Sequence, residues 1–181
     1  MYEIEKRSAL NKTQFEKLKK YLDKHAESLG TQEMKSYLFR EPTFLRIRIV
    51  DQKITITEKI GSYDQAVRRE EEYELDSAKL PAFVEEKKHN GYTHCSLVHT
   101  IRTTYKIDEL KVELNQIDHL GLIVEIEAMT AHAEEIDTLT KEIDACMKKL
   151  DLKELDTQEY QEMMTKMYAQ TLKPVEHQSF L

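Results

Sequence analysis

The chain has 181 residues, 34% of them charged and 40% hydrophobic, enough for one domain with a real core but too few for two ordinary domains. Lys and Arg number 27 against 34 Asp and Glu, and the net charge of −7 argues against a general nucleic-acid binder, which usually carries a basic excess. The 4 glycines cannot form G-x-G-x-x-G or G-x-x-x-x-G-K, so phosphate binding by a glycine-rich loop is excluded.

The N-terminal residues Met1–Arg7 contain no apolar segment, so no signal peptide is expected. No run of about 18 apolar residues is present to cross a membrane. The cysteines, Cys95 and Cys146, form no C-x-x-C pair, and two free thiols are typical of a reducing cytoplasm. We therefore expect a cytoplasmic protein with no membrane or nucleic-acid partner, either a monomer or a homodimer.

Hydrophobic periodicity predicts mostly strands, followed by a helical C-terminal third. The predicted elements, in chain order, are a strand at 2–8, a helix from Asn11 to about residue 28 that Gly30 ends, strands at 34–40, 43–50, 53–60 and 66–75, a helix over Leu80–His89, strands at 93–106, 110–116 and 122–129, and helices at about 131–150 and 157–172. The absence of repeats and linkers predicts a single α+β domain over 1–181, with strands within about 2–129 and terminal helices within about 131–172.

Charged and apolar residues alternate in at least six of these strands. In the segment 44–50, Arg46 and Arg48 share one face while Leu45 and Ile47 share the other. The charged faces also carry acidic pairs on some strands, such as Glu125 and Glu127, and basic pairs on others. A single strand of this kind favours an ordinary sheet with one solvated face.

The recurrence of the pattern favours a second arrangement, a closed antiparallel sheet with a charged interior. Its apolar face would then pack against outer helices, including the C-terminal ones. Charges inside a closed sheet need water, metal ions or a charged ligand to compensate them. The methionines of the terminal helices, Met147, Met163, Met164 and Met167, are expected to fill the packing between those helices.

The charged side chains suit a metal-bound polyphosphate. Carboxylate pairs two residues apart are oxygen ligands for Mg²⁺ or Mn²⁺ rather than for zinc. Arginine and lysine side chains suit phosphate oxygens, and arginine binds them through two parallel hydrogen bonds. A metal ion offsets the phosphate charge and can lower the pKa of a bound water for attack.

The chain resembles the CYTH domain, or triphosphate tunnel metalloenzyme, superfamily over about residues 2–128. Glu3-Ile-Glu-Lys-Arg7 is similar to the opening E-x-E-x-K signature, and Arg46-Ile-Arg48 and Thr57-Glu-Lys59 are similar to the R-x-R and T-x-K elements. Three further family elements match Arg68-Arg-Glu70-Glu-Glu72, Thr100-Ile-Arg102, and Leu120-Gly followed by Glu125-Ile-Glu127. The superfamily includes class IV adenylyl cyclases, thiamine triphosphatases and inorganic triphosphatases.

The resemblance implies a closed eight-stranded antiparallel β tunnel with a charged interior, a divalent metal (Mg²⁺ or Mn²⁺) and a small triphosphate substrate. It implies metal ligands at Glu3, Glu5, Glu125, Glu127 and Asn115, triphosphate binding by Arg46, Arg48, Lys59, Arg68 and Arg102, and catalytic roles for Glu5, Glu70, Glu72 and Arg7. Arg7 stands where the family has lysine, Thr100 where it has a phosphate-binding lysine, and Asn115 where it usually has aspartate. Arginine keeps the charge of lysine but is a poor proton acceptor.

Three functions remain open at this stage. The first is a metal-dependent hydrolase of inorganic tripolyphosphate, a nucleoside triphosphate or thiamine triphosphate. The second is a class IV-type adenylyl cyclase that makes cyclic AMP from ATP. The third is a non-catalytic polyphosphate-binding module.

Overall fold

We analysed a computed structural model of the chain, which describes residues 2–60, 67–177 and 180. Within these ranges, the side chains of 59–60, 67–70 and 177 lie outside the description. Lys59, Arg68 and Glu70, three of the expected site residues, therefore have their strand positions assigned, but their side chains fall outside the described part. In the described part of the chain, no helix has the length and apolar character needed to cross a membrane.

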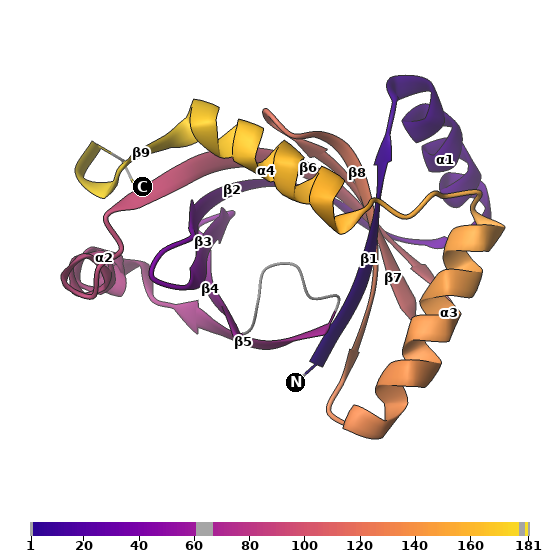
Figure 1. Cartoon of the computed structure of the whole chain (residues 1–181), viewed down its shortest axis with the longest axis horizontal. Helices are drawn as coiled ribbons and strands as arrows, with labels where there is room; N and C mark the ends of the chain where they lie inside the picture. The colour runs from indigo at the N-terminus through magenta and orange to yellow at the C-terminus, as the bar shows by residue number, and fades with distance from the viewer. Residues whose placement is uncertain (1, 61–66, 178–179, 181) are drawn as a thin grey trace.

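The chain forms an antiparallel sheet with helices around it, which confirms the predicted α+β class (Figure 1). The strands are β1 (Tyr2–Leu10), β2 (Glu27–Phe39), β3 (Phe44–Val50), β4 (Lys53–Ile60), β5 (Val67–Leu75), β6 (His94–Ile107), β7 (Leu110–Ile117), β8 (Gly121–Thr130) and the short β9 (Leu172–Pro174). The helices are α1 (Lys12–His25), α2 (Leu80–His89), α3 (Ile136–Lys149) and α4 (Thr157–Thr171), with 3-10 turns at Ser77–Lys79, Ala133–Glu135 and Val175–His177.

The strands pair in the order β2-β3-β4-β5-β1-β8-β7-β6, and β6 pairs back onto β2, so the pairings run in a ring. One seam of the ring is short, because β5 pairs with β1 only through Tyr2–Ile4. By contrast, β1 pairs with β8 along its whole length. The expected tunnel is therefore present, and the described residues join β5 to β1 at one end of this seam only.

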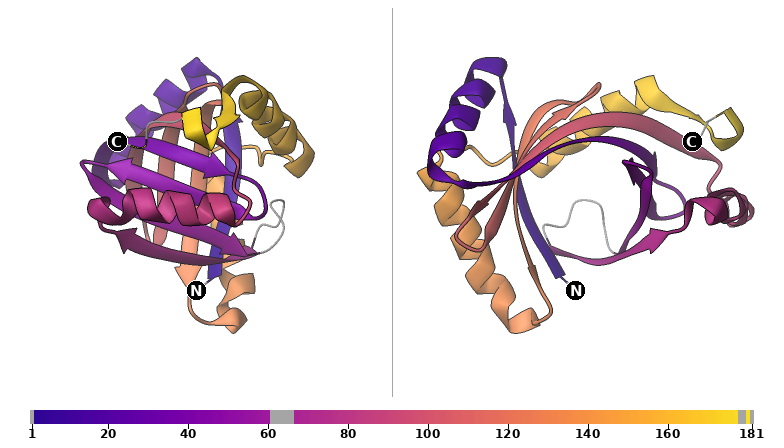
Figure 2. Two further views of the ribbon diagram at one scale, coloured as in Figure 1. Left: turned by 90° about the vertical axis from the view of Figure 1, so that its left-hand side faces the viewer. Right: turned by 180° about the vertical axis from the view of Figure 1, so that it is seen from behind.

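The alternation in the sequence translates directly into an inner and an outer face. The apolar residues Ile47 and Ile56 lie opposite each other on the outer face, and the polar residues Arg48 and Thr55 lie opposite each other on the inner face. Helix α2 covers the outer side of β2, β3 and β4, in a cluster with Leu45, Ile54 and Leu80. Helices α1 and α3 cover the outer side of the strands on the other half of the ring (Figure 2).

Helix α4 does not join this outer cover, which corrects one expectation from the sequence. Met164 and Met167 of α4 cluster with Val98 of β6, and Val98 lines the interior of the ring together with both methionines. Met147 of α3 belongs instead to the outer cluster with α1. Helix α4 thus runs along the rim of one mouth of the tunnel, beside β6 (Figure 1), because its apolar residues pack against the inner rather than the outer face.

A second correction concerns Gly30, which was expected to end the first helix. Helix α1 already ends at His25, and the chain continues at once into β2. Gly30 lies inside β2 with φ +105°, at a register shift in the pairing with β6. A positive φ costs glycine little, so the residue accommodates a bulge in the strand rather than a helix end.

Replacing Tyr105 with Phe is expected to lower the free energy of unfolding by about 1 kcal/mol. The buried Tyr105 hydroxyl donates to Asp23 Oδ1 at 2.5 Å and ties β6 to α1. Urea titration of the wild type and the variant measures the difference. Tyr21→Phe is the matched control, because Tyr21 lies on α1, as Asp23 does, with 39% of its surface exposed. An equal loss of unfolding free energy in both variants would contradict the role given to the Tyr105–Asp23 hydrogen bond.

Candidate active site

The interior of the ring holds a cavity of about 290 Å³. The inward residues of β1, β3, β6 and β8 form its charged walls, and α4 contributes an apolar wall at one mouth. Its charged lining residues in the described part of the chain are Glu3, Glu5, Arg7, Arg46, Arg48, Glu72, Arg102, Lys111, Glu125 and Glu127. The structure therefore brings together, around one cavity, every described residue of the expected site except Asn115.

Two arginines of β3 carry buried donors without partners. The Nε atoms of Arg46 and Arg48 are buried and make no hydrogen bond. Arg46 also donates through Nη2 to Thr57 Oγ1 at 3.0 Å, whereas no described carboxylate forms an ion pair with Arg48. Burial, together with repulsion from Arg46 and Arg102, lowers the pKa of Arg48 to about 9. An anion with several oxygens would satisfy these donors and offset this repulsion.

Arg7 bridges two buried carboxylates on the opposite side of the cavity. Its Nε donates to Glu125 at 3.0 Å, and its Nη2 forms a close ion pair with Glu5. Burial alone would raise the pKa of Glu125, but Arg7 and Arg102 outweigh it and lower this pKa well below its usual range. Glu5 and Glu125 also hold the pKa of Arg7 above its ordinary value despite burial, so Arg7 is a fixed cation.

Asn115 positions side chains of this network. Its Oδ1 accepts from Arg102 Nε at 2.7 Å, and its Nδ2 donates to Glu125 Oε2 at 3.0 Å. Arg102 further contacts Glu113 at 2.5 Å through Nη1 and Glu125 at 3.1 Å through Nη2. Asn115 is fully buried, and the described residues that line the cavity do not include it.

Glu127 has fewer cations around it than Glu125, which lies between Arg7 and Arg102. It forms a close ion pair with Lys111, and it lies directly across the β1–β8 ladder from Glu5. Burial and the nearby Glu113 raise its pKa. Carboxylates paired across a ladder repel each other, and a cation bound between them would relieve this repulsion.

Glu72 of β5 faces the cavity beside the β3 arginines. It accepts a hydrogen bond from Thr57 at 3.0 Å and lies 3.7 Å from Arg46 Nη2. Its side chain is 47% exposed, in contrast to the 5% of Glu5. Among the described carboxylates of the expected catalytic set, Glu72 is therefore the more accessible one.

The carboxylate oxygens that line the cavity are of the kind that bind a hard divalent cation. The carboxylates Glu3, Glu5 and Glu127 come from the adjacent strands β1 and β8 and line the same cavity, and oxygen ligands of this kind suit Mg²⁺ or Mn²⁺. In the described residues, no three His, Cys, Asp or Glu side chains gather into a metal-binding group. Arg7 and Lys111 instead pair with these carboxylates.

Three residues in or beside the cavity, Lys111, Glu113 and Tyr160, were not predicted from the sequence. Glu113 is 2% exposed and joins Arg102 to Lys111, at 2.5 Å and 3.3 Å respectively. Both Glu113 and Lys111 share the alternating set of β7 with Asn115, so the period of two contained the signal for them. The ring of Tyr160 on α4, by contrast, lies 4.6 Å from Arg7 Cζ, and strand periodicity carries no information about a helix that returns to the tunnel mouth.

Solved structures share this fold. A conserved hypothetical protein from Pyrococcus furiosus is 26% identical, over 83% of this chain and 91% of that one, with a TM-score of 0.65. A putative adenylate cyclase from Vibrio parahaemolyticus is 17% identical over 91% and 98% of the two chains, with a TM-score of 0.67. A putative adenylyl cyclase from Hippeastrum, described as having a dominant triphosphatase activity, is 17% identical over 84% and 89%, with a TM-score of 0.54.

No curated protein matches the sequence. The family model of the CYTH domain matches residues 1–160, which include all eight strands of the ring and the start of α4. The charged cavity is thus formed entirely by elements within, or beginning within, the matched region. On this match, the chain belongs to the CYTH domain family.

Proposed function

We propose that this protein is a metal-dependent hydrolase of a small triphosphate, with its active site in the tunnel. The observation that carries the proposal is the pair of buried Nε donors of Arg46 and Arg48, which face the cavity without partners. Buried donors without partners are costly, and a polyphosphate supplies acceptor oxygens and negative charge together. Arg102, and Lys59 and Arg68 from β4 and β5, are proposed to complete the phosphate grip.

The opposite wall supplies the proposed metal ligands. CYTH family proteins are metal-dependent, and we assign binding of Mg²⁺ or Mn²⁺ to Glu3, Glu5, Glu125 and Glu127. When bound, a divalent cation supplies neutralisation of phosphate charge and acidification of a water molecule. The expected ligand role of Asn115 becomes a positioning role in our proposal, since both ends of its amide already bind Arg102 and Glu125.

The chain's own residues orient the reaction and accept the proton. Arg46 and Arg48 hold the terminal phosphoryl group and stabilise the charge that develops on it. Water attacks phosphorus in line, the bond to the bridging oxygen breaks, and the leaving phosphate chain takes the bond electrons. We assign proton acceptance to the accessible Glu72, with Glu70 on the same face of β5, and a purely electrostatic role to Arg7.

A substrate and metal panel tests the proposal. Phosphate release is measured with Mg²⁺ or Mn²⁺ on tripolyphosphate, ATP and thiamine triphosphate, and cyclic AMP is measured in the ATP reactions. Metal-dependent phosphate release is the expected result. Cyclic AMP with pyrophosphate would instead establish a cyclase, and tight tripolyphosphate binding without either product would establish a binding module.

Glu5→Gln is expected to lower the turnover rate by at least about 100-fold in a protein that still folds, because the amide keeps the shape of the side chain but lacks the charge proposed to hold the metal. The melting temperature should fall as well, since Arg7 loses one of its two buried counter-charges. Steady-state phosphate release and thermal unfolding measure the two effects. Glu71→Gln is the matched control, since Glu71 is exposed and lies on the outer face of β5. Unchanged turnover in Glu5→Gln would exclude the assignment of Glu5 to the metal.

A further inference from the structure

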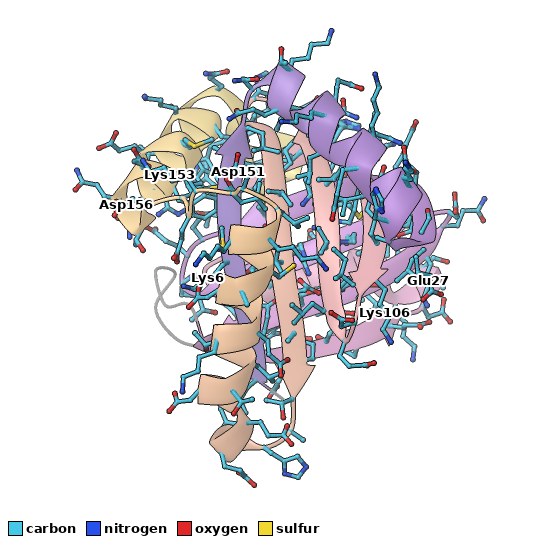
Figure 3. The ribbon with its side chains drawn as sticks, turned by 90° about the vertical axis from the view of Figure 1, so that its right-hand side faces the viewer. Lys6, Glu27, Lys106, Asp151, Lys153 and Asp156 are labelled. Atoms are coloured by element: carbon cyan, nitrogen blue, oxygen red, sulfur yellow. The ribbon has the colours of Figure 1, made fainter. Side chains whose placement is uncertain are left out.

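The segment 154–160 consists of the end of the α3–α4 linker and the first turn of α4. It contacts β1 beside the charged cavity through Glu154, Leu155 and Tyr160. Lys6 Nζ lies 2.9 Å from Glu154 and 2.6 Å from Asp144. The backbone N–H of Leu155 donates to the carbonyl oxygen of Arg7 at 2.7 Å. Figure 3 shows Lys6 on β1, between α3 and the linker that runs from Asp151 to Asp156.

The backbone contact lies on the edge of β1 beyond its pairing with β5. Strand β5 begins at Val67, which pairs with Ile4, so among the described residues no strand pairs with this edge of β1 after Ile4. A backbone carbonyl at such an edge needs another donor, and Leu155 supplies it for Arg7. The segment therefore covers the edge of β1 at Arg7, beyond the part of β1 that pairs with β5.

The side-chain contact lies on the inner side of this wall. The guanidinium of Arg7 donates to Glu5 and Glu125 from its edge, and its face lies 4.6 Å from the centroid of the Tyr160 ring. Only a planar cation can bind carboxylates along its edge and an aromatic ring on its face at the same time. An arginine at position 7 and an aromatic ring at position 160 thus form a matched pair.

From these contacts we infer that Tyr160 is a positioning residue of the active site, and that α4 acts on the chemistry through the Tyr160–Arg7 stack. The ring fixes the plane of Arg7, and Arg7 in turn fixes the carboxylates of Glu5 and Glu125. The inference rests on the proposed triphosphatase activity for its kinetic consequence. Its structural consequence is measurable without any activity.

The structural test follows the Nε–Hε signal of Arg7 by NMR, with Arg7→Lys identifying the signal by its loss. In the wild type we expect this proton to be shifted upfield by the ring and to exchange slowly with solvent. Tyr160→Leu should return the signal to the usual arginine position, and Tyr160→Phe, which keeps the ring, should retain the shift. An Arg7 signal that is identical in Tyr160→Leu and the wild type would overturn the inference.

The kinetic test uses the best substrate of the panel. Tyr160→Leu is expected to lower kcat about 10-fold with KM changed less than about twofold, because misplacement affects the reacting geometry more than binding. Tyr160→Phe should restore most of the rate. In an Arg7→Lys background, Tyr160→Leu should have little further effect, whereas independent effects of the two residues would be additive and would overturn the inference.

Tyr168→Leu is the matched control for the stability of α4. Tyr168 lies on the same helix, and its ring is 4.8 Å from Arg40 Cζ rather than near Arg7. This variant should lower the melting temperature but leave the Arg7 signal and kcat unchanged. If kcat falls as much in Tyr168→Leu as in Tyr160→Leu, both effects on kcat come from helix packing, and the positioning role of Tyr160 is contradicted. If the wild type releases no phosphate from any substrate, the proposed function fails, and the NMR result alone decides the positioning of Arg7.

Discussion

Arg48→Met is expected to make the ligand-free protein more stable and to weaken tripolyphosphate binding by at least about 100-fold, as loss of a buried charge-assisted contact does. Burial and the neighbouring arginines lower the pKa of Arg48 to about 9, so below that pH Arg48 is charged in both the folded and the unfolded state, and its buried charge destabilises the fold. Removing the charge should raise the free energy of unfolding by about 1 kcal/mol or more.

Because of these two effects, the order of the melting temperatures of the wild type and Arg48→Met should reverse when ligand is added. Without ligand, Arg48→Met should melt above the wild type. With saturating tripolyphosphate and Mg²⁺, the wild type should gain stability by mass action and melt above the variant. Calorimetric titration gives the affinities directly.

Arg40→Met is the control, because Arg40 is exposed and does not line the cavity in the described structure. It should leave tripolyphosphate affinity unchanged. A variant at Arg48 that loses stability without ligand and still binds tripolyphosphate tightly would contradict the assignment of Arg48 to the phosphate grip.

Glu125→Gln is expected to lower the free energy of unfolding by roughly 3–5 kcal/mol at neutral pH, the loss typical when one partner of a buried ion pair is removed. Glu125 lies 3.0 Å from Arg7 and 3.1 Å from Arg102, both of which are largely buried. Removing the carboxylate leaves two cations that have lost a shared counter-charge. Urea unfolding at several pH values measures the loss.

The sign of the pH dependence follows from the lowered pKa of Glu125. The ionised carboxylate stabilises the fold fully above its ordinary value of 4.5, and this contribution decreases as the pH falls from 4.5 towards the lower folded pKa. The difference between the wild type and Glu125→Gln should therefore narrow on acidification. A difference that is constant between about pH 6 and pH 3 would contradict the lowered pKa.

Glu127→Gln is the matched control, two residues along the same strand. The pKa of Glu127 is raised rather than lowered, first by burial and then by Glu113. Its ionised form is thus disfavoured in the fold, and the substitution should cost little stability or none at neutral pH. Affinity for the divalent cation should nevertheless fall in Glu127→Gln, because a proposed ligand is lost, and isothermal titration with Mn²⁺ measures this.

The sequence predicted the strand architecture well because the period of two is a local signal. Arg46 and Arg48 alternate with Leu45 and Ile47, and such a pattern assigns faces without any knowledge of neighbouring strands. Most predicted ends of strands and helices lie within one or two residues of the observed ends. The exceptions were the end of the first helix, the start of β2, which was predicted at 34 and lies at Glu27, and the start of α3, which was predicted at about 131 and lies at Ile136. The first two share a cause, because Gly30 was taken as a helix end although it lies at a bulge within β2.

The pairing of charges could not be predicted in the same way. Glu125 and Glu127 are indistinguishable in the sequence, yet one lies between two arginines and the other beside Glu113 and Lys111, and their pKa values shift in opposite directions. This difference depends on which strands become neighbours, and β8 lies between β1 and β7, which are far apart from each other along the chain. The ion pair between Glu113 of β7 and Arg102 of β6 depends on neighbouring strands in the same way.

The sequence by itself determined an inward charged face, an outward apolar face and resemblance to a family, because alternation and motif spacing are properties of single strands. Only the tertiary structure decided that Arg48 lacks a carboxylate partner among the described residues, while Arg7 bridges two carboxylates. It also placed α4 along the rim of the tunnel mouth, with the Tyr160 ring against Arg7. The contacts of Arg7 with Glu125 and with Tyr160 join residues more than 100 positions apart, and burial and Coulomb interactions between them depend on distance in space rather than along the chain.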